Sequence, residues 1–448
     1  MPEACQAAHM ANAATAPRKV LIIGGGFAGL ECARKLANDK SFEVTLLDRT
    51  NHHLFQPLLY QVATASLAAP DIARSIRQIL CDAANVTVLM DEVMAISPAE
   101  KTVTGKSGGI YTFDYLVLAA GAKTGFFGND QWEENSLGLK SLADAQNIRR
   151  KILSNLEQAE LTTDLAERER LMTIAIVGGG PTGVELAGAC ADLIHRSLKS
   201  NFRRIDTSKL RVILIENSPE ILEHYDPHQS AYAKERLQKL GVEVRNGTRV
   251  TDVRKGELQF LDGSSLKAEA IVWAAGIAAN PLTKDLGVET DRAGRITPKP
   301  DLSVPGHPDI FVAGDLTNMK DREGKFVPGV APAATQMGDH IAALLKEELR
   351  LEKTKFADRK HDLRPLFKYT DKGMMAIIGK NAAVMKVGSF TMNGFPAWIA
   401  WLLIHILFLI GFRNKLSVLL GWAYSYIVNN PEARIIVHPP ASVPPPKG

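Results

Sequence analysis

Closely spaced cysteines are absent from this sequence. Its 448 residues include only four cysteines, Cys5, Cys32, Cys81 and Cys190, which form neither a C-x-x-C nor a C-x₄-C pair. An enzyme that reduces disulfides needs two neighbouring thiols, so that chemistry is excluded. We expect Cys32 and Cys190 to be buried apolar thiols, and we expect no bound metal.

A strong net charge is also absent. The formal charge of +4 is too small to suggest a nucleic acid as a partner. Residues 1–17 are rich in alanine but have no apolar core, so we expect a disordered lead-in rather than a signal peptide. Residues 439–448 are rich in proline, and we expect them to form an extended tail.

One glycine motif occurs twice, after the apolar residues 20–23 and again after 174–177. Each copy is typical of a strand, a glycine turn and a helix whose free N–H groups attract a pyrophosphate. The copies consist of Gly24, Gly25, Gly26, Phe27, Ala28 and Gly29, and of Gly178, Gly179, Gly180, Pro181, Thr182 and Gly183. Two copies predict two dinucleotides in one chain, an arrangement that suits electron transfer between them.

An acidic residue ends the next predicted strand in each copy. Asp48 follows residues 43–47, and Glu216 follows residues 211–215. Such a carboxylate accepts a hydrogen bond from a ribose 2′-OH and repels a 2′-phosphate, so Glu216 favours NADH over NADPH. The second copy is longer than the first, and we expect its extra residues, 195–209, to form a helix extension and a loop.

The order of the predicted strands indicates one domain inserted in another. Residues 113–121 and 270–276 are similar apolar strands that end in Ala-Gly, and residues 309–315 end in Gly314 and Asp315. The fold class predicted is α/β, with two Rossmann-like dinucleotide-binding domains, the second inserted in the first. We expect the first domain at 18–140 and 291–350, the second at 141–290, and a C-terminal helical region at 351–438.

The C-terminal region contains two apolar runs. Residues 395–412 are apolar except for His405, residues 413–415 are polar and basic, and residues 416–428 carry further aromatic side chains. These features favour two helices that lie in one leaflet at the bilayer interface, where they could also form dimer contacts. A buried or dimer-interface helix pair and a membrane-spanning helix remain alternatives, since the first run is close to the length needed to span.

Together these features resemble the flavoproteins with two dinucleotide-binding domains, and most closely the type II NADH dehydrogenases, which are single-subunit NADH:quinone oxidoreductases. The resemblance extends over residues 19–437. It is carried by both glycine motifs, by residues 54–63, by Gly314 and Asp315, by residues 331–336 and by the apolar C-terminal helices. Residues 55–62, residues 331–336 and the apolar helices are more specific than the glycine motifs.

The resemblance implies that FAD binds non-covalently in the first domain and that NADH, the substrate, binds in the second. It assigns Gly24, Gly26, Phe27, Ala28, Gly29, Asp48, Arg49, Gln56, Val93, Ala120, Gly121, Gly314, Asp315 and Ala334 to FAD. It assigns Gly178, Gly180, Pro181, Thr182, Gly183, Glu185, Glu216, Ala275 and Gly276 to NADH. It places Ala333, Gln336 and Lys380 at the quinone, with Glu185 and Gln336 as the catalytic residues.

The resemblance further implies hydride transfer from NADH to FAD, followed by two-electron reduction of a quinone without proton pumping. The expected setting is the cytoplasmic face of the cell inner membrane, with a homodimer bound peripherally to lipid. Two other enzyme classes stay open, a sulfide:quinone oxidoreductase and a ferredoxin-type reductase. The first needs reactive cysteines, and the second would lack apolar C-terminal helices. A non-catalytic scaffold that responds to NADH is a third alternative.

Overall fold

The computed structural model describes residues 16–194, 201–321, 323–428 and 435–436. The expected tail, most of the expected lead-in and residues 195–200 of the expected helix extension lie outside the described residues. The chain forms two compact units. The first comprises Met1–His53, Ser75–Gly121 and Ala279–Thr370, and the second comprises Leu54–Arg74, Ala122–Ala278 and Asp371–Gly448.

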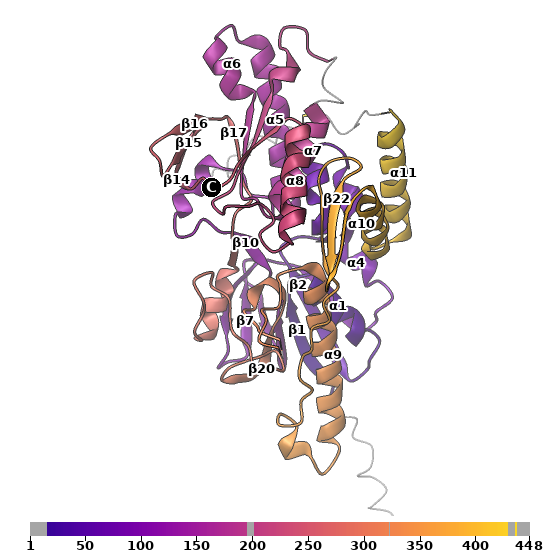
Figure 1. The fold of residues 1–448 in the computed structure, drawn as a ribbon. Helices are drawn as coiled ribbons and strands as arrows, with labels where there is room; N and C mark the ends of the chain where they lie inside the picture. The colour runs from indigo at the N-terminus through magenta and orange to yellow at the C-terminus, as the bar shows by residue number, and fades with distance from the viewer. Residues whose placement is uncertain (1–15, 195–200, 322, 429–434, 437–448) are drawn as a thin grey trace, which may run out of the picture. The chain divides into compact units, whose positions relative to one another are not determined.

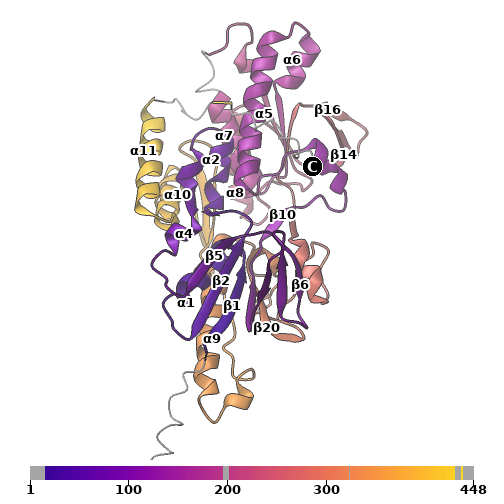
Figure 2. The ribbon, with the colours of Figure 1, turned by 180° about the vertical axis from the view of Figure 1, so that it is seen from behind.

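A mostly parallel sheet forms the core of the first unit. Its central strands contain continuous buried apolar runs at residues 20–23 and 115–118, as expected where a sheet is buried on both faces. In spatial order they are β19 (Ser303–Val304), β20 (His307–Val312), β9 (Tyr115–Leu118), β1 (Arg18–Ile23), β2 (Phe42–Asp48) and β5 (Val86–Met90). β19 alone runs antiparallel to its neighbour. Figure 2 shows β1, β2 and β5 next to one another, so the strands predicted around the first glycine motif are confirmed.

Two helices pack closely on this sheet. Helix α1 (Phe27–Leu36) and helix α9 (Ala331–Glu352) lie side by side (Figure 1). Gly338 of α9 meets the backbone of Ala28, and a side chain at Gly338 would collide with it. The unit also contains the short helix α4 (Ile76–Ile79) and an antiparallel sheet of β6 (Val93–Ser97), β7 (Thr102–Gly105) and β8 (Ile110–Thr112).

A second parallel sheet forms the core of the second unit. In spatial order its strands are β13 (Val242–Arg245), β12 (Arg211–Ile215), β11 (Thr173–Val177) and β17 (Ala270–Trp273). The helices of this part are α5 (Leu142–Leu161), α6 (Leu165–Leu171), α7 (Pro181–Asp192) and α8 (Pro227–Lys239). An antiparallel sheet of β14 (Val250–Arg254), β15 (Glu257–Phe260) and β16 (Ser265–Lys267) is attached to it. The strands predicted around the second glycine motif are therefore also confirmed.

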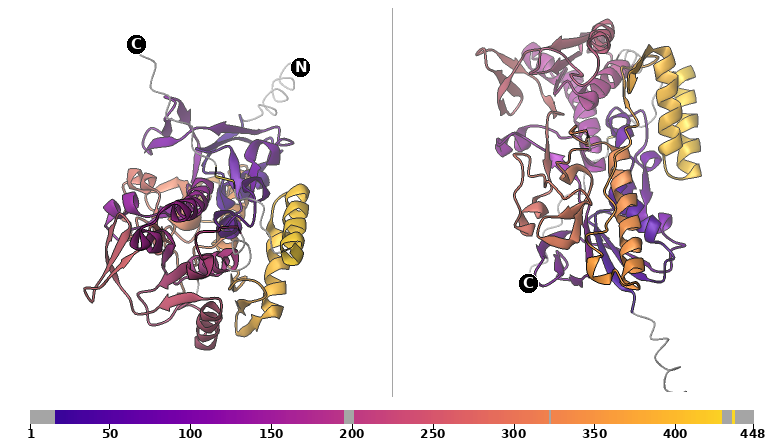
Figure 3. Two further views of the ribbon diagram at one scale, coloured as in Figure 1. Left: turned by 90° about the horizontal axis from the view of Figure 1, so that it is seen from above. Right: turned by 60° about the horizontal axis from the view of Figure 1, so that its bottom comes forward.

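The C-terminal region adds three strands and two helices to the second unit. They are β21 (Met374–Ile377), β22 (Ala383–Val387), β23 (Phe390–Gly394), α10 (Phe395–Phe408) and α11 (Phe412–Val428). Both views in Figure 3 draw α10 and α11, in yellow, next to each other. Among the residues that the structure describes, no helix is both long and apolar enough to cross a membrane.

The expected break between the two C-terminal helices is wrong by a few residues. The basic residues 413–415 lie within the first turn of α11, and the chain turns before them, at 409–411. Gly411 has a φ of +94°, a conformation that glycine adopts at little cost. Asn414 holds the new helix start, because its amide donates to the carbonyls of Pro70 and Asp71, at 2.9 Å each.

The unit boundaries differ from the expected domain boundaries, because the chain passes from one unit to the other after residues 53, 74, 121, 278 and 370. Residues 54–74 and 122–140, expected in the first domain, belong to the second unit, and residues 279–290 belong to the first. Residues 54–74 contain the helices α2 (Leu59–Ala63) and α3 (Ala69–Ile72). Four short strands lie where the chain passes between units: β3 (His52–Leu54), β4 (Ala73–Ser75), β10 (Ala122–Thr124) and β18 (Ile277–Ala279).

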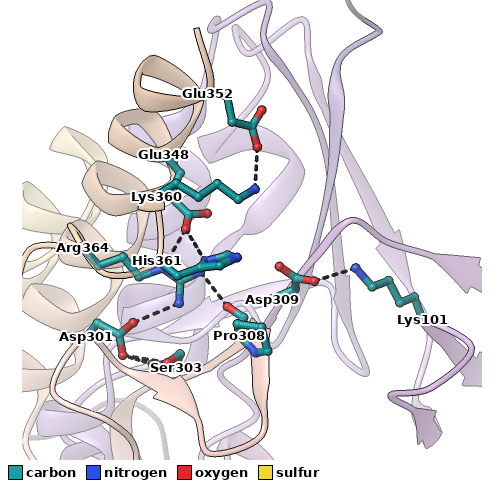
Figure 4. Close-up of polar contacts among 10 residues, drawn as sticks. All are labelled: Lys101, Asp301, Ser303, Pro308, Asp309, Glu348, Glu352, Lys360, His361 and Arg364. Carbon is teal, nitrogen blue, oxygen red and sulfur yellow. Dashed lines mark hydrogen bonds and ion pairs between the residues drawn. The ribbon is translucent and has the colours of Figure 1, made fainter. Parts of the chain in front are cut away.

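A buried ionic network fastens the segment after α9 to the first unit (Figure 4). The Arg364 side chain, only 3% exposed, donates to Glu348 at 2.7 Å and to Asp301 at 2.9 Å. It also donates to the carbonyl of Pro308 at 2.7 Å, and His361 contacts the same oxygen of Glu348 at 2.9 Å. Buried charges need such partners, so this network fixes where residues 353–370 lie.

Replacing Arg364 should therefore destabilise the protein strongly. Arg364→Met leaves two buried carboxylates without their partner, and we expect the free energy of unfolding to fall by about 3–5 kcal/mol. The matched control is Arg350→Met, because Arg350 pairs with Glu347 on the exposed surface of α9. Urea unfolding of the full chain measures both variants. Equal unfolding midpoints for the two would show that the network is not needed for stability.

Candidate functional site

The first and last glycines of the first glycine loop, Gly24 and Gly29, have no room for side chains. Gly24 has a φ of +103°, and a side chain there would collide with the carbonyl of Ala119. A side chain at Gly29 would collide with the carbonyl of Gly24. Nothing lies within 4 Å of a side chain built at Gly26, and no side chain caps α1. The loop therefore leaves open space at Gly26 and no side-chain cap on α1, as a bound pyrophosphate requires.

Asp48 is tied to this loop. Its carboxylate accepts from the N–H of Gly25 at 2.7 Å and from the N–H and hydroxyl of Thr50 at 2.7 and 2.8 Å. These bonds hold the carboxylate at the end of β2, beside the open turn. A ribose hydroxyl can donate to its remaining lone pairs, which is the role predicted for Asp48.

The second glycine loop repeats this geometry in the second unit. Gly178 has a φ of +114°, and a side chain there would meet the backbone N of Ala275 at 2.7 Å. A side chain at Gly183 would collide with the carbonyl of Gly178, whereas Gly180 faces open space. No side chain caps α7, where Pro181 and Thr182 are exposed. Gly276, with a φ of +78°, follows the neighbouring strand β17, which ends at Trp273.

Glu216 has the same place here as Asp48 has in the first unit. It accepts from the N–H of Gly179 at 2.5 Å and from the N–H of Ser218 at 2.7 Å. Arg211, at the start of the same strand, pairs instead with Glu243 at 2.9 Å. Arg211 is therefore engaged by a carboxylate other than Glu216, and the preference for NADH stays a prediction.

Two further predicted residues of the first unit meet at the start of α9. Gly314 has a φ of +72°, and a side chain built there would lie 3.5 Å from the side chain of Ala334. Asp315 follows in a short turn, while Ala333 is buried in the first turn of α9. The amide of Gln336 both donates to the carbonyl of Thr370 at 3.0 Å and accepts from its N–H at 2.9 Å. Ala333 and Gln336 remain predictions for the quinone end of the flavin.

The other residues predicted to bind FAD lie in less distinctive settings. Gly121 has a φ of +67° with open space beside it, and Ala120 is half-buried next to it. Arg49 is exposed, and Val93 is half-buried at the start of β6. Gln56 belongs to the second unit, where its amide donates to the carbonyl of Lys140 at 3.0 Å.

Phe27 packs its ring edge-on against His53, with centroids 5.1 Å apart. Because burial lowers the pKa of His53, its imidazole stays neutral, and its Nδ1 lies 2.9 Å from the carbonyl of Gly25. A carbonyl can only accept, so Nδ1 carries the proton. Phe27 and His53 thus support the loop from behind.

A cavity of about 740 Å³ opens in the second unit, where α7, α10 and α11 meet the segment around α2. Its walls are mostly apolar, and Glu185 is a carboxylate among them. Burial raises the pKa of Glu185 to about 8, although the N–H of Ile377, 3.4 Å from its carboxylate, acts in the opposite direction. Glu185 is therefore a protonated acid at neutral pH, facing an apolar space.

Lys380 lines the same cavity, as its predicted role requires, but its ammonium has partners. It donates to the carbonyl of Tyr426 at 2.8 Å and lies 4.2 Å from the centre of the Tyr426 ring. This places a positive charge at the C-terminal end of α11, where the helix dipole favours it. Lys380 and Glu185 are brought together around one cavity.

Several polar residues of the cavity were not predicted. Tyr60 and Gln61 line it from α2, and Trp422 lines it from α11. Tyr225, which lies outside the lining, is close enough to Glu185 for the carboxylate charge to raise its pKa further. Tyr60 and Gln61 were within the segment singled out in the sequence. The sequence feature that could have indicated their role is the presence of these two polar side chains in an otherwise apolar helix.

The cysteines of the described part agree with the expected structural role. Cys32 and Cys190 are buried, and burial raises the pKa of each thiol to about 12. Thiols in this state are unreactive at neutral pH. Cys81 is exposed and unpaired, and Cys5 lies outside the described residues.

Comparison with known proteins connects these sites to a family. Residues 18–338 match the pyridine nucleotide-disulphide oxidoreductase family. The type II NADH:quinone oxidoreductase Ndh of Mycobacterium tuberculosis is 42% identical over 420 residues, which covers 91% of this chain and 88% of the relative.

Two solved structures share the fold. NDH2 of Plasmodium falciparum in complex with NADH superposes with a TM-score of 0.83 at 20% identity, covering 94% of this chain and 100% of the other. The sulfide:quinone oxidoreductase of Aquifex aeolicus has a TM-score of 0.66 at 19% identity, covering 94% and 96%. At such low identities these two matches speak for the fold alone.

Coenzyme preference tests the role of Glu216. Glu216→Gln keeps the shape of the side chain but removes the negative charge that repels a 2′-phosphate. We expect the ratio of kcat/KM for NADH to that for NADPH to fall about tenfold or more. Glu243→Gln, at an exposed carboxylate on the neighbouring strand, is the control and should leave the ratio unchanged. An unchanged ratio in the Glu216 variant would remove the residue from ribose recognition.

Proposed function

We propose that this chain, which belongs to the type II NADH:quinone oxidoreductases of the pyridine nucleotide-disulphide oxidoreductase family, oxidises NADH and reduces a quinone. The observation that carries the proposal is the apolar cavity with a protonated Glu185 in its wall. A quinone ring is apolar and needs protons when it is reduced, and this cavity offers both an apolar wall and an acid. The duplicated glycine loops supply the two nucleotide sites that such a reaction needs.

FAD is the cofactor expected in the first unit. The open space at Gly26 and Gly121, the free N–H groups of α1 and the held carboxylate of Asp48 fit its pyrophosphate and ribose. When bound, FAD supplies the two-electron redox chemistry between NADH and quinone. The residues of the loop would bind and orient FAD through hydrogen bonds, as the expected non-covalent attachment requires.

The protein's own contributions are alignment and proton supply. Glu216 and the loop at Gly178 hold NADH, and apolar side chains keep water out of the cavity. Glu185 keeps its proton in this apolar setting and can donate it to a quinone oxygen. Once Glu185 has donated this proton, the carboxyl must be reprotonated before the next turnover.

Membrane binding is proposed for α10 and α11. Most of their exposed side chains are apolar, with Leu407 70%, Phe412 82% and Leu420 60% exposed. Arg413 and Lys415 lie beside them, and such a mixture suits lipid headgroups above an apolar layer. The 17 residues of α11 extend about 26 Å, less than the thickness of a bilayer core.

We therefore propose peripheral attachment through one leaflet, on the cytoplasmic face of the inner membrane, where NADH is available. The cavity is lined in part by the same two helices, so a quinone dissolved in lipid would have a short route to it. A homodimer formed through the C-terminal region belongs to this proposal as well.

Steady-state oxidation of NADH tests the proposed function. The purified full-length chain, loaded with FAD, should consume NADH rapidly when a short-chain quinone is added and slowly without it. Ferricyanide, a soluble acceptor, reports the NADH half of the reaction separately. Reduction of ferricyanide without reduction of quinone would point to another acceptor.

The pH dependence of quinone reduction tests Glu185. With a pKa of about 8, the carboxyl is protonated below that pH and loses its proton as the pH rises through it. We expect kcat with quinone to fall above about pH 8 and Glu185→Gln to lower it about 100-fold and to abolish this fall. A Glu185→Gln enzyme that kept the same pH profile would exclude Glu185 as the acid.

Charged substitutions on the two helices test the membrane proposal. Leu407→Glu combined with Leu420→Glu places charges on the exposed apolar faces of α10 and α11, outside the cavity lining. We expect sedimentation with anionic phospholipid vesicles to be lost, while FAD stays bound. Leu161→Glu, at a side chain 74% exposed on α5, is the matched control and should sediment normally. Persistent sedimentation of the double variant would place the lipid-binding surface elsewhere.

A further inference from the structure

A short chain of hydrogen bonds leads from α11 to the wall of the cavity. The indole N–H of Trp422 donates to Oε1 of Gln61 at 2.8 Å. Nε2 of Gln61 donates in turn to the hydroxyl oxygen of Tyr60 at 2.9 Å. The three side chains line the cavity, and Tyr60 and Gln61 are otherwise buried.

The chemistry of these groups fixes the direction of the chain. An indole N–H can only donate, so the amide oxygen of Gln61 must face Trp422. The amide NH₂ group therefore faces Tyr60, and the Tyr60 oxygen must accept. The proton of the Tyr60 hydroxyl is not used in this bond and has to point to another acceptor.

The fold holds this arrangement firmly. Asn414 and Ser417 of α11 bind the segment that carries Tyr60, through the carbonyl of Asp71 at 2.9 Å and its carboxylate at 2.7 Å. The ring of Tyr60 also packs edge-on against Trp401 of α10, with centroids 6.5 Å apart. Both C-terminal helices thus contribute to the position of one hydroxyl group.

We propose that Tyr60 donates a hydrogen bond to a carbonyl oxygen of the quinone, and that Gln61 and Trp422 fix the direction of its hydroxyl. A quinone has carbonyl acceptors and no donors, so it complements a wall in which Tyr60 offers an O–H. Burial raises the pKa of Tyr60 well above its usual value of 10, so the hydroxyl keeps its proton. This inference rests on the proposed function.

The arrangement makes the quinone site depend on the helix proposed to bind lipid. Trp422 lies on α11, and its indole is the group that orients Gln61. If α11 moves away, the amide of Gln61 is free to turn, and the Tyr60 proton loses its fixed direction. Trp422 and Gln61 are therefore positioning residues, while Tyr60 is the residue that contacts the substrate.

A double-mutant cycle tests this proposal. Tyr60→Phe removes the hydroxyl and keeps the ring, and Trp422→Phe removes the indole N–H and keeps an aromatic side chain. We expect Tyr60→Phe to raise the KM for a short-chain benzoquinone about five- to tenfold, the effect of losing one hydrogen bond. Trp422→Phe should raise it by a smaller factor. Rates with ferricyanide report the amount of folded, active enzyme in each preparation.

The double variant gives the decisive result. Because Trp422 acts through Tyr60, adding Trp422→Phe to Tyr60→Phe should produce no further rise in the quinone KM. The proposal would be overturned if the rise in quinone KM of the double variant equalled the product of the two single rises, or if Tyr60→Phe left the KM unchanged. The matched control is Trp132→Phe, which removes an indole hydrogen bond to Asp252 outside the cavity and should leave the quinone KM as it is.

Failure of the proposed function gives a different result. If the unmodified enzyme reduces ferricyanide but no quinone, the proposed function fails and this inference fails with it. If the unmodified enzyme reduces quinone and Tyr60→Phe has the same KM, only the inference about Tyr60 fails.

Discussion

Both nucleotide sites depend on one close approach within the backbone. The carbonyl of Gly24 faces the Cα of Gly29, as that of Gly178 faces Gly183, and no side chain fits between them. This contact sets the start of the helix directly at the end of the strand, so the free N–H groups gather in one place. The acidic residue of the next strand then binds the middle glycine at 2.7 Å in one loop and 2.5 Å in the other. The turn, the uncapped helix start and the position of the acidic side chain are consequences of the same packing.

The cavity of the second unit uses a different principle, the removal of water. Apolar side chains of α7, α10 and α11 surround Glu185 and raise its pKa to about 8, so an acid is kept protonated at neutral pH. Burial also keeps the imidazole of His405 on α10 neutral, since it lowers the pKa of this side chain to about 4. A space lined in this way suits an uncharged ring that takes up protons, and lipid is the medium in which such rings dissolve.

The sequence predicted the parts of the molecule that depend on local pattern. The strands at 20–23 and 174–177 were confirmed because parallel strands buried on both faces are continuous apolar runs. The helix break near 413–415 was wrong because the turn is made by Gly411, and a basic triplet can form a first helical turn once Asn414 finds carbonyl partners. The contact between Gln61 and Trp422 joins residues 361 positions apart, so no local pattern announces it. The unit boundaries differ from the predicted domain boundaries because residues 54–74 pack within the second unit, although the chain segments on either side of them belong to the first.

The most direct test of the account follows the visible absorbance of the flavin in the absence of oxygen. Addition of one equivalent of NADH to the FAD-loaded enzyme should bleach the flavin, and addition of one equivalent of quinone should restore its absorbance fully. Each half can thus be seen separately in one sample. A flavin that NADH bleaches but quinone does not restore would contradict the claim that the cavity at Glu185 receives a quinone.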